Sequence, residues 1–171
     1  MVVDVEASKK VIVGLGETGL SVAKYLASRD QKFKVIDSRS NPPALSELKR
    51  ILPEVETEIG ELKLTTLLEA SELVVSPGLS LKTPAIAEAA EQGVPITGDI
   101  DIFSKSVNKP IIAVTGSNGK STVVAILARI LEKAGKRYGL GGNLDGTNFK
   151  PALDLLSEEP KDFYILELSS F

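Results

Sequence analysis

The sequence predicts an α/β protein built on parallel sheets. Short runs rich in β-branched and other apolar residues alternate with stretches that repeat apolar residues at helical spacing. The expected strands are 10–13, 33–36, 73–75, 95–97, 110–115, 137–140 and 163–168, and the expected helices are 19–28, 44–51, 84–92, 99–104, 120–134 and 152–157. Strand and helix in alternation indicate parallel strands joined by crossover helices.

Prolines and polar segments divide this pattern. Pro42 and Pro43 break the chain after the second strand, and Pro53 ends the helix that follows. The pattern over 54–70 is weaker, and we expect one strand at 55–59 and one helix near 64–68 there. The polar segment 104–109 is the best candidate for a domain junction.

We therefore expect a first α/β domain at 1–98, a connecting helix and linker at 99–109, and a second α/β domain at 110–171. The second domain has too few expected helices to cover both faces of a parallel sheet. We therefore expect this domain to be truncated.

Composition limits the possible functions. The chain has 171 residues, 43% of them hydrophobic, and a net charge of −3 without a basic cluster, so nucleic acid is a poor candidate partner. It has no cysteine, no apolar stretch long enough to cross a bilayer, and no signal-peptide pattern at the N-terminus. We expect a cytoplasmic protein that acts as a monomer and does not bind membranes.

A phosphate-binding loop is predicted between the strand 110–115 and the helix 120–134. Residues 114–122 read V-T-G-S-N-G-K-S-T, which follows the P-loop pattern G-x-x-x-x-G-K-[ST] except that Val114 replaces its first glycine. The alternative is an ordinary turn with a solvated Lys120, but a lysine in the first turn opposes the helix dipole unless an anion lies beside it. We expect ATP or GTP to bind here, through Gly116, Ser117, Asn118, Gly119, Lys120, Ser121 and Thr122.

The chain contains no histidine, so the commonest general base and metal ligand is missing. Its chemistry must use carboxylates, hydroxyls, lysine and a hard cation, and Mg²⁺ with phosphate fits that set. Ser121 and Glu167 are the expected ligands of this metal. Glu167 ends a strongly apolar strand, where an acid seldom occurs without a partner; the alternative is a carboxylate in solvent or paired with a lysine.

A second glycine pattern lies in the first domain. Gly14, Gly16 and Gly19 follow the first strand, and Asp37 ends the second, as in the dinucleotide-binding fingerprint of Rossmann-like domains. NAD is the obvious ligand for this pattern, and a plain tight turn is the alternative. The segments 37–39 and 76–78 follow two further strands, so all three loops should meet at the carboxyl edge of the sheet.

The combination of motifs resembles the Mur ligases of bacterial peptidoglycan synthesis. The shared segments are 14–19, 76–78, 115–122, the Gly-Gly-Asn sequence at 141–143 and the Glu-Leu-Ser-Ser-Phe sequence at 167–171. The resemblance covers the whole chain in order. Its phosphate loop and its last segment are specific, and the glycine-rich start is less so.

The resemblance implies a Rossmann-like domain that binds the UDP part of a muramyl substrate, followed by the start of a P-loop ATP-binding domain. It assigns the substrate contacts to Thr18, Asp37, Ser38, Arg39, Ser76 and Asn143. It gives Lys120 and Glu167 catalytic roles with ATP and Mg²⁺. The implied reaction phosphorylates the carboxylate of UDP-N-acetylmuramoyl-L-alanine, and the amine of D-glutamate then displaces phosphate to form an amide.

The segment 144–150 is longer than in the family, and the family's remaining parts, including the domain that holds D-glutamate, are expected to lie outside this sequence, so we do not expect turnover from this chain alone. One rival is another ATP-dependent ligase of the same superfamily, such as the folate polyglutamylating enzyme. The other rival is an NAD-binding or regulatory module without ligase activity.

Overall fold

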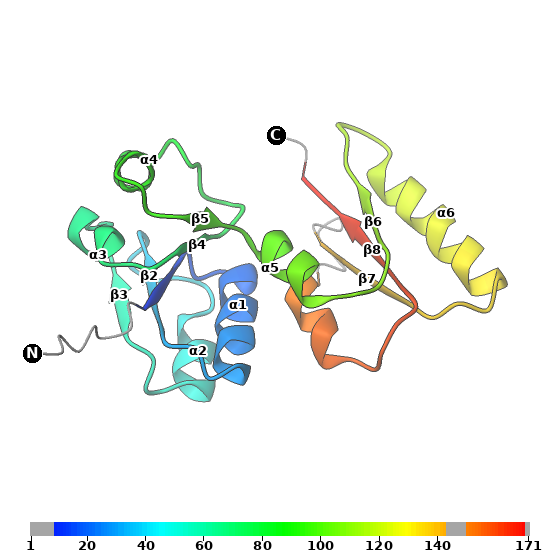
Figure 1. Cartoon of the computed structure of the whole chain (residues 1–171), viewed down its shortest axis with the longest axis horizontal. Coiled ribbons are helices and arrows are strands. Elements are labelled where there is room, and N and C mark those ends of the chain that lie inside the picture. The colour runs from blue at the N-terminus through cyan, green and yellow to red at the C-terminus, as the bar shows by residue number, and fades with distance from the viewer. Residues whose placement is uncertain (1–8, 143–149, 170–171) are drawn as a thin grey trace, which may run out of the picture. The chain divides into compact units, whose positions relative to one another are not determined.

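The alternating pattern of the sequence forms two separate α/β units. The computed structural model describes residues 9–142 and 150–169. The first unit is Met1–Asp99 and the second is Ile100–Phe171 (Figure 1). Each unit has its own parallel sheet with helices beside it, and each is described by itself below.

The first unit contains a five-stranded parallel sheet in the order β3-β2-β1-β4-β5. The strands are β1 (Lys10–Val13), β2 (Phe33–Asp37), β3 (Thr57–Ile59), β4 (Leu73–Val75) and β5 (Ile96–Thr97). The chain moves outward to one side of β1 through β2 and β3, and then to the other side through β4 and β5. Such a reversal of strand order opens a crevice at the carboxyl ends of the central strands, where ligands of these folds bind.

Helices cover both faces of this sheet because its central strands are apolar on both faces. The helices are α1 (Glu17–Ser28), α2 (Leu45–Ile51), α3 (Leu64–Leu68) and α4 (Pro84–Glu91). Leu67 of α3 and Ile86 of α4 join Val11, Val13 and other strand residues in one buried cluster. Helix α1 contacts β1 and β2, and it lies on the opposite side of the sheet from α3 (Figure 1).

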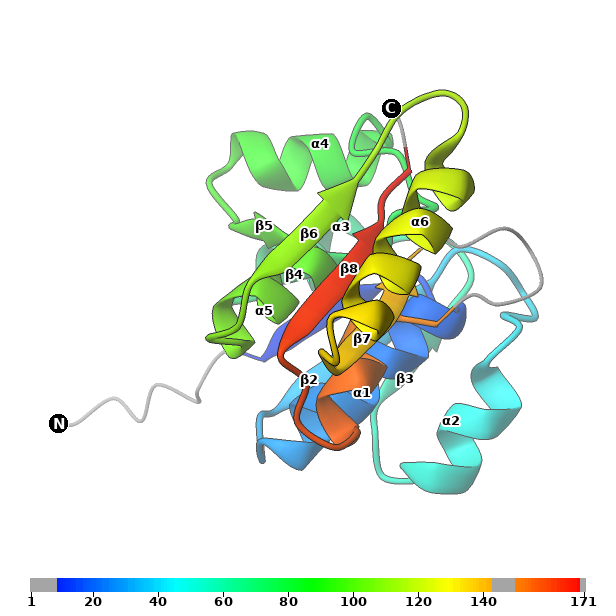
Figure 2. The same ribbon diagram turned by 90° about the vertical axis from the view of Figure 1, so that its right-hand side faces the viewer.

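The second unit contains a three-stranded parallel sheet in the order β6-β8-β7. Strand β8 (Phe163–Glu167) lies between β6 (Ile111–Val114) and β7 (Tyr138–Gly142), as Figure 2 shows. The register sets Glu167 opposite Val114 on one side and opposite Gly142 on the other. The carboxyl ends of all three strands therefore meet at Glu167.

Each face of this second sheet packs against a different helix. Val124 of α6 (Lys120–Lys133) joins Val114 and Ile165 in a buried cluster. On the other face, Phe103 of α5 (Asp99–Ser106) meets Tyr164 edge-on, with ring centroids 5.1 Å apart and planes at 87°. The short helix η1 (Ala152–Ser157) contacts β7. Nearly all of helix α5, which the sequence suggested as part of a connection, thus belongs to the second unit.

The α/β architecture expected from the sequence is confirmed, and its elements differ from the expected ranges mainly at their ends. Helix α1 starts at Glu17 rather than at residue 19, which places an acidic side chain in the first turn, where the helix dipole favours it. Strand β7 continues past Leu140 because Gly141 and Gly142 pair with Leu166 and Glu167. The segment Ala152–Ser157 forms a 3₁₀ helix rather than an α-helix.

Candidate functional site

The loops that follow β1, β2 and β4 form a cleft of about 190 Å³ at the carboxyl edge of the first sheet. The cleft is lined by Gly14, Gly16, Asp37, Ser38, Arg39, Ser76, Gly78 and Leu79. The structure thus brings together Asp37, Ser38, Arg39 and Ser76, which come from loops that are far apart in the sequence. Thr18 lies in the first turn of α1 and is not among these lining residues.

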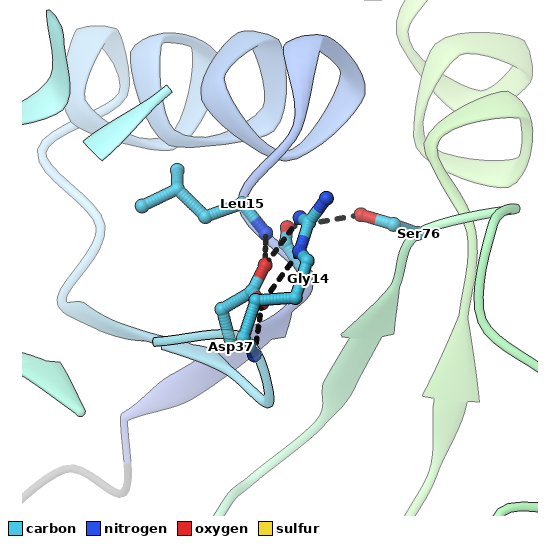
Figure 3. A network of polar contacts seen from close by, with 5 residues as sticks. Gly14, Leu15, Asp37 and Ser76 are labelled. Carbon is cyan, nitrogen blue, oxygen red and sulfur yellow. Dashed lines mark hydrogen bonds and ion pairs between the residues drawn. The ribbon is translucent and has the colours of Figure 1, made fainter. Parts of the chain in front are cut away.

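The turn between β1 and α1 requires its glycines for close backbone contact. Gly14 has φ +102°, a conformation that an L side chain rarely adopts. A Cβ on Gly19 would lie 1.9 Å from the carbonyl oxygen of Gly14. The Ser76 hydroxyl donates a hydrogen bond of 3.0 Å to that same carbonyl (Figure 3). The glycines therefore allow α1 to start close to the end of β1, and Ser76 links this turn to the loop after β4.

The Asp37 carboxylate is buried and fully occupied by contacts within the protein. Its Oδ2 accepts hydrogen bonds from the Leu15 backbone N–H at 2.6 Å and from Arg39 Nη2 at 2.6 Å. Its Oδ1 accepts from the Arg39 backbone N–H at 2.8 Å and from Arg39 Nε at 2.9 Å. Figure 3 shows Asp37 beside Leu15 and Gly14 in this network. Burial alone would raise the pKa of Asp37, but the bonds from Arg39 and Leu15 hold that pKa below its usual range.

In the second unit, the loop between β6 and α6 has the backbone of a phosphate-binding turn. Gly116 and Gly119 have φ of +141° and +76°, and a Cβ at either position would have no atom within 4 Å. An anion could therefore approach the backbone at both glycines without steric hindrance. Val114 departs from the general pattern because it is the last residue of β6 and is buried in the core.

Lys120 is the first residue of α6, and its side chain folds back over this loop. Its Nζ donates a hydrogen bond of 2.8 Å to the carbonyl oxygen of Gly116. The first turn of α6 contains no acidic residue to offset this positive charge at the helix start. A lysine held here supplies fixed positive charge to an anion at the N-terminus of α6.

Glu167 lies at the end of β8, beside the start of α6. Only 1% of its surface is exposed. The Ser121 hydroxyl donates a hydrogen bond of 3.1 Å to its Oε2. Within residues 9–142 and 150–169, no lysine or arginine forms an ion pair with Glu167. A buried carboxylate without a positive partner is costly, and a bound cation would offset that cost.

Gly142 packs directly against the backbone of Glu167. It has φ +96°, and a Cβ on it would lie 2.1 Å from the carbonyl oxygen and 2.9 Å from the nitrogen of Glu167. Only a glycine allows β7 to run this close to β8 at the point where Glu167 leaves the strand. The sequence showed Gly142 only as part of a family motif, and its contact with Glu167 emerges from the strand register.

Ser121 and Glu167 are too few to bind a metal by themselves, but they suit a magnesium ion that is also bound by waters and phosphate oxygens. In the part of the chain that the structure describes, no group of three or more histidine, cysteine, aspartate or glutamate side chains is placed to hold a metal ion. Mg²⁺ commonly binds through one or two protein oxygens together with waters and substrate phosphates. A buried carboxylate and a hydroxyl beside a phosphate loop match that mode of binding.

The other expected site residues divide into two groups. Ser117, Asn118 and Thr122 lie in or directly after the loop and are exposed. Asn143 and most of the long segment that follows it, residues 143–149, lie outside the described residues. The sequence did not predict the contact of the Leu15 N–H with Asp37 or the contact of Gly142 with Glu167. The sharp turn directly after β1 is the signal that could have pointed to the Leu15 N–H.

Comparison with known proteins identifies the family of the chain. Residues 8–98 match the family model described as "Mur ligase MurD-like, N-terminal domain", and residues 114–171 match "Mur ligase middle domain". The chain belongs to the Mur ligase family. The two matched segments fall in the first and the second unit of the structure, respectively.

The chain is also similar in sequence to individual Mur ligases. The chain is 51% identical over 162 residues to the UDP-N-acetylmuramoylalanine–D-glutamate ligase of Pseudomonas aeruginosa, covering 95% of this chain and 35% of that enzyme. It is 47% identical over 164 residues to the ligase of the same name from Coxiella burnetii, covering 96% and 36%. The chain thus spans about a third of the length of these relatives.

Solved structures of Mur ligases share the fold. The UDP-N-acetylmuramate:L-alanyl-gamma-D-glutamyl-meso-diaminopimelate ligase of Neisseria meningitides matches with a TM-score of 0.57 and 20% identity, covering 94% of this chain and 52% of that one. A murein peptide ligase of Psychrobacter arcticus matches with a TM-score of 0.53 and 22% identity, covering 94% and 37%. In the described part of this chain, none of the helices has the length and apolar character needed to span a bilayer.

Proposed function

We propose that this chain is the UDP-substrate-binding unit and the first part of the ATP-binding unit of a UDP-N-acetylmuramoylalanine–D-glutamate ligase. The observation that carries this proposal is the identity of 47–51% to ligases of that name over nearly the whole chain. The two glycine turns of the structure support it, because each lies at the carboxyl edge of its own parallel sheet, where ligands of such folds bind.

The cleft of the first unit is proposed to bind the UDP part of UDP-N-acetylmuramoyl-L-alanine. Arg39 and the Ser38 hydroxyl line it and could donate hydrogen bonds to an anionic nucleotide. The Ser76 hydroxyl also lines it and, because its hydrogen is donated to the Gly14 carbonyl, could accept a hydrogen bond from the ligand. The Asp37 carboxylate already accepts four hydrogen bonds from the protein. It is therefore poorly suited to bind the ribose diol of NAD, which argues against a dinucleotide module. Thr18 and Asn143 belong to the proposed substrate contacts through the family resemblance.

The phosphate loop of the second unit is proposed to bind ATP. Gly116, Ser117, Asn118, Gly119 and Thr122 would surround its phosphates, with Lys120 placed to neutralise the charge of the β- and γ-phosphates. Ser121 and Glu167 would hold Mg²⁺. When bound, this ion would withdraw charge from the phosphate oxygens and so favour transfer of the terminal phosphoryl group.

The proposed reaction needs no nucleophile from the protein. A carboxylate oxygen of the muramyl substrate attacks the γ-phosphorus of ATP, and ADP leaves. The nitrogen of the D-glutamate amine then attacks the carbonyl carbon of the acyl phosphate. The C–O bond to the phosphate breaks, inorganic phosphate leaves with the electron pair, and the nitrogen releases a proton as the amide forms. The chain's own contribution is to hold the two anions in line and neutralise their charge. A cytoplasmic location belongs to this proposal, because UDP-linked substrates and ATP are cytoplasmic. A monomeric state is proposed with it.

Separate titrations test the two binding sites. We expect the chain to bind UDP in preference to NAD and to bind ATP in the presence of Mg²⁺, as measured by isothermal titration calorimetry. Lys120→Ala should weaken ATP binding by about 10- to 100-fold, since bonds to charged groups contribute about 1.5–3 kcal/mol. Lys133→Ala, at the far end of the same helix, is the matched control and should have no effect. Binding of NAD without UDP would identify a dinucleotide module, and ATP binding without UDP would favour another ligase.

A turnover assay tests the incomplete part of the proposal. The chain is incubated with ATP, Mg²⁺, UDP-N-acetylmuramoyl-L-alanine and D-glutamate, and released phosphate is measured against the Lys120→Ala variant. We expect no difference, because the remaining two-thirds of the relatives' length would supply the rest of the site. Phosphate release above the control would show that this chain suffices for turnover.

A further inference from the structure

The hydrogen bonds of Asp37 use all of its capacity to accept. A carboxylate offers about four lone-pair sites. Two N–H groups reach Oδ1 and two reach Oδ2, at distances of 2.6 to 2.9 Å. The side chain is 2% exposed. Asp37 therefore lines the cleft by position but has little capacity left to accept a hydrogen bond from a ligand.

Arg39 is the opposite case. Its side chain is 51% exposed, yet two of its guanidinium nitrogens, Nε and Nη2, are bonded to the two oxygens of Asp37. A guanidinium is planar and rigid, so two parallel bonds fix its plane as well as its position. An exposed arginine without such a clamp would lose considerable rotamer freedom on binding a ligand. Here that freedom is already restricted, and Arg39 lines the cleft.

We propose that Asp37 is a positioning residue, which holds the Arg39 guanidinium at the cleft for an anionic uridine nucleotide without touching that ligand itself. The identity of the ligand rests on the proposed function. Contact with the nucleotide is made by Arg39 and by the hydroxyls of Ser38 and Ser76. The clamp also occupies the carboxylate that a dinucleotide-binding domain uses for a ribose diol, so the same arrangement disfavours NAD.

A double-mutant cycle distinguishes positioning from direct contact. UDP affinity is measured calorimetrically for the full 171-residue chain and for Asp37→Asn, Arg39→Ala and the double variant. We expect each single variant to bind UDP about tenfold more weakly, and the double variant to bind no more weakly than Arg39→Ala. If the two losses multiply in the double variant, Asp37 contacts the ligand directly and the proposal is wrong. An unchanged affinity in Asp37→Asn would also overturn it.

Controls keep the cycle interpretable. Asparagine retains an oxygen that can accept from the Leu15 N–H, so we expect Asp37→Asn to fold, as judged by its NMR spectrum. If it does not fold, Asp37→Glu replaces it, because the longer side chain keeps the charge but shifts the clamp. Arg50→Ala removes an exposed arginine whose partner Glu47 lies on the same helix, and it should leave UDP affinity unchanged.

A measurement without ligand separates this inference from the proposed function. In the wild-type chain, ¹⁵N relaxation of the Arg39 Nε–H group, measured by NMR, should show that this group is ordered. In Asp37→Asn it should show fast side-chain motion. If the wild type binds no UDP, the proposed function fails, and this signal still decides whether Asp37 immobilises the guanidinium. A mobile Nε–H in the wild type would refute the inference.

Discussion

Two buried carboxylates, one in each unit, lie at the end of a parallel strand beside a glycine turn. Asp37 is 2% exposed and accepts four hydrogen bonds, two of them from a charged guanidinium. Glu167 is 1% exposed, and in the described part of the chain the Ser121 hydroxyl donates a hydrogen bond to it. The two acids are similarly buried, but among residues 9–142 and 150–169 only the first forms an ion pair.

The difference indicates what each acid does. The charge of Asp37 is offset within its own loop, so its contribution is to the order of the folded cleft. Glu167 has no ion pair among the described residues, so a positive ligand at this point would offset the cost of its burial. Burial of an acid alone therefore does not mark a ligand site; the surrounding donors must be counted.

The largest expected effect comes from the glycine that positions Glu167. Gly142→Ala should destabilise the second unit by about 3–5 kcal/mol, because a clash with backbone adds to the cost of positive φ. Gly135→Ala is the matched control: its φ is +66°, but no atom lies within 4 Å of the added Cβ. It should cost only about 1 kcal/mol. Urea unfolding followed by the NMR signals of each unit measures both; equal losses would show that the contact with Glu167 is unimportant.

Asp37→Asn should destabilise the first unit by about 2 kcal/mol, because hydrogen bonds to a charged group are lost. The loss is not larger because solvent screens the exposed Arg39 side of the ion pair. The second unit should be unaffected. The same urea experiment reports both units at once. Unchanged stability of the first unit would mean that the clamp on Arg39 contributes nothing to the fold.

Glu167→Gln should stabilise the protein in the absence of ligand, whereas the two preceding variants destabilise it. Without nucleotide or metal, removal of a buried charge that lacks a positive partner should stabilise the second unit by about 1 kcal/mol. The same variant should lose Mg²⁺-dependent ATP affinity by about 10- to 100-fold, the usual range for disturbed metal sites. The gain is read from metal-free unfolding and the loss from titrations with and without Mg²⁺. A destabilised metal-free variant would show that the charge of Glu167 is satisfied by the protein.

The smallest expected effect is a pH dependence confined to the first unit. The pKa of Asp37 is lower in the folded protein than its usual value. Its contribution to stability is therefore fully present above the unfolded pKa of about 4 and is lost as pH falls through the lower folded pKa. Stability of the first unit, measured from pH 7 down to pH 2, should fall more steeply in the wild type than in Asp37→Asn. Parallel curves would contradict the shift.

The sequence predicted the fold well because local patterns determine it. Apolar strands, helical spacing and proline breaks placed nearly all elements to within a few residues, and the glycine turns and Lys120 were visible as motifs. The partners of Asp37 were not predictable in the same way, since the return of the Arg39 side chain onto Asp37 depends on a loop conformation. The contact between Gly142 and Glu167 depends on strand register, which joins segments separated along the chain. Ala152–Ser157 forms a 3₁₀ helix that contacts β7, and its local pattern did not distinguish this form from an α-helix.

The position of β8 between β6 and β7 ties the assembly of the second unit to its ligand chemistry. Neither outer strand pairs with the other in this three-stranded sheet; each is hydrogen-bonded to β8. Among the described strands, β6 and β7 are linked only through Phe163–Glu167, which comes after both in the sequence. The same strand places Glu167 beside Ser121. Pairing of β8 with its two neighbours and the meeting of Ser121 with Glu167 therefore depend on the same long-range contacts, and contacts of this kind form slowly.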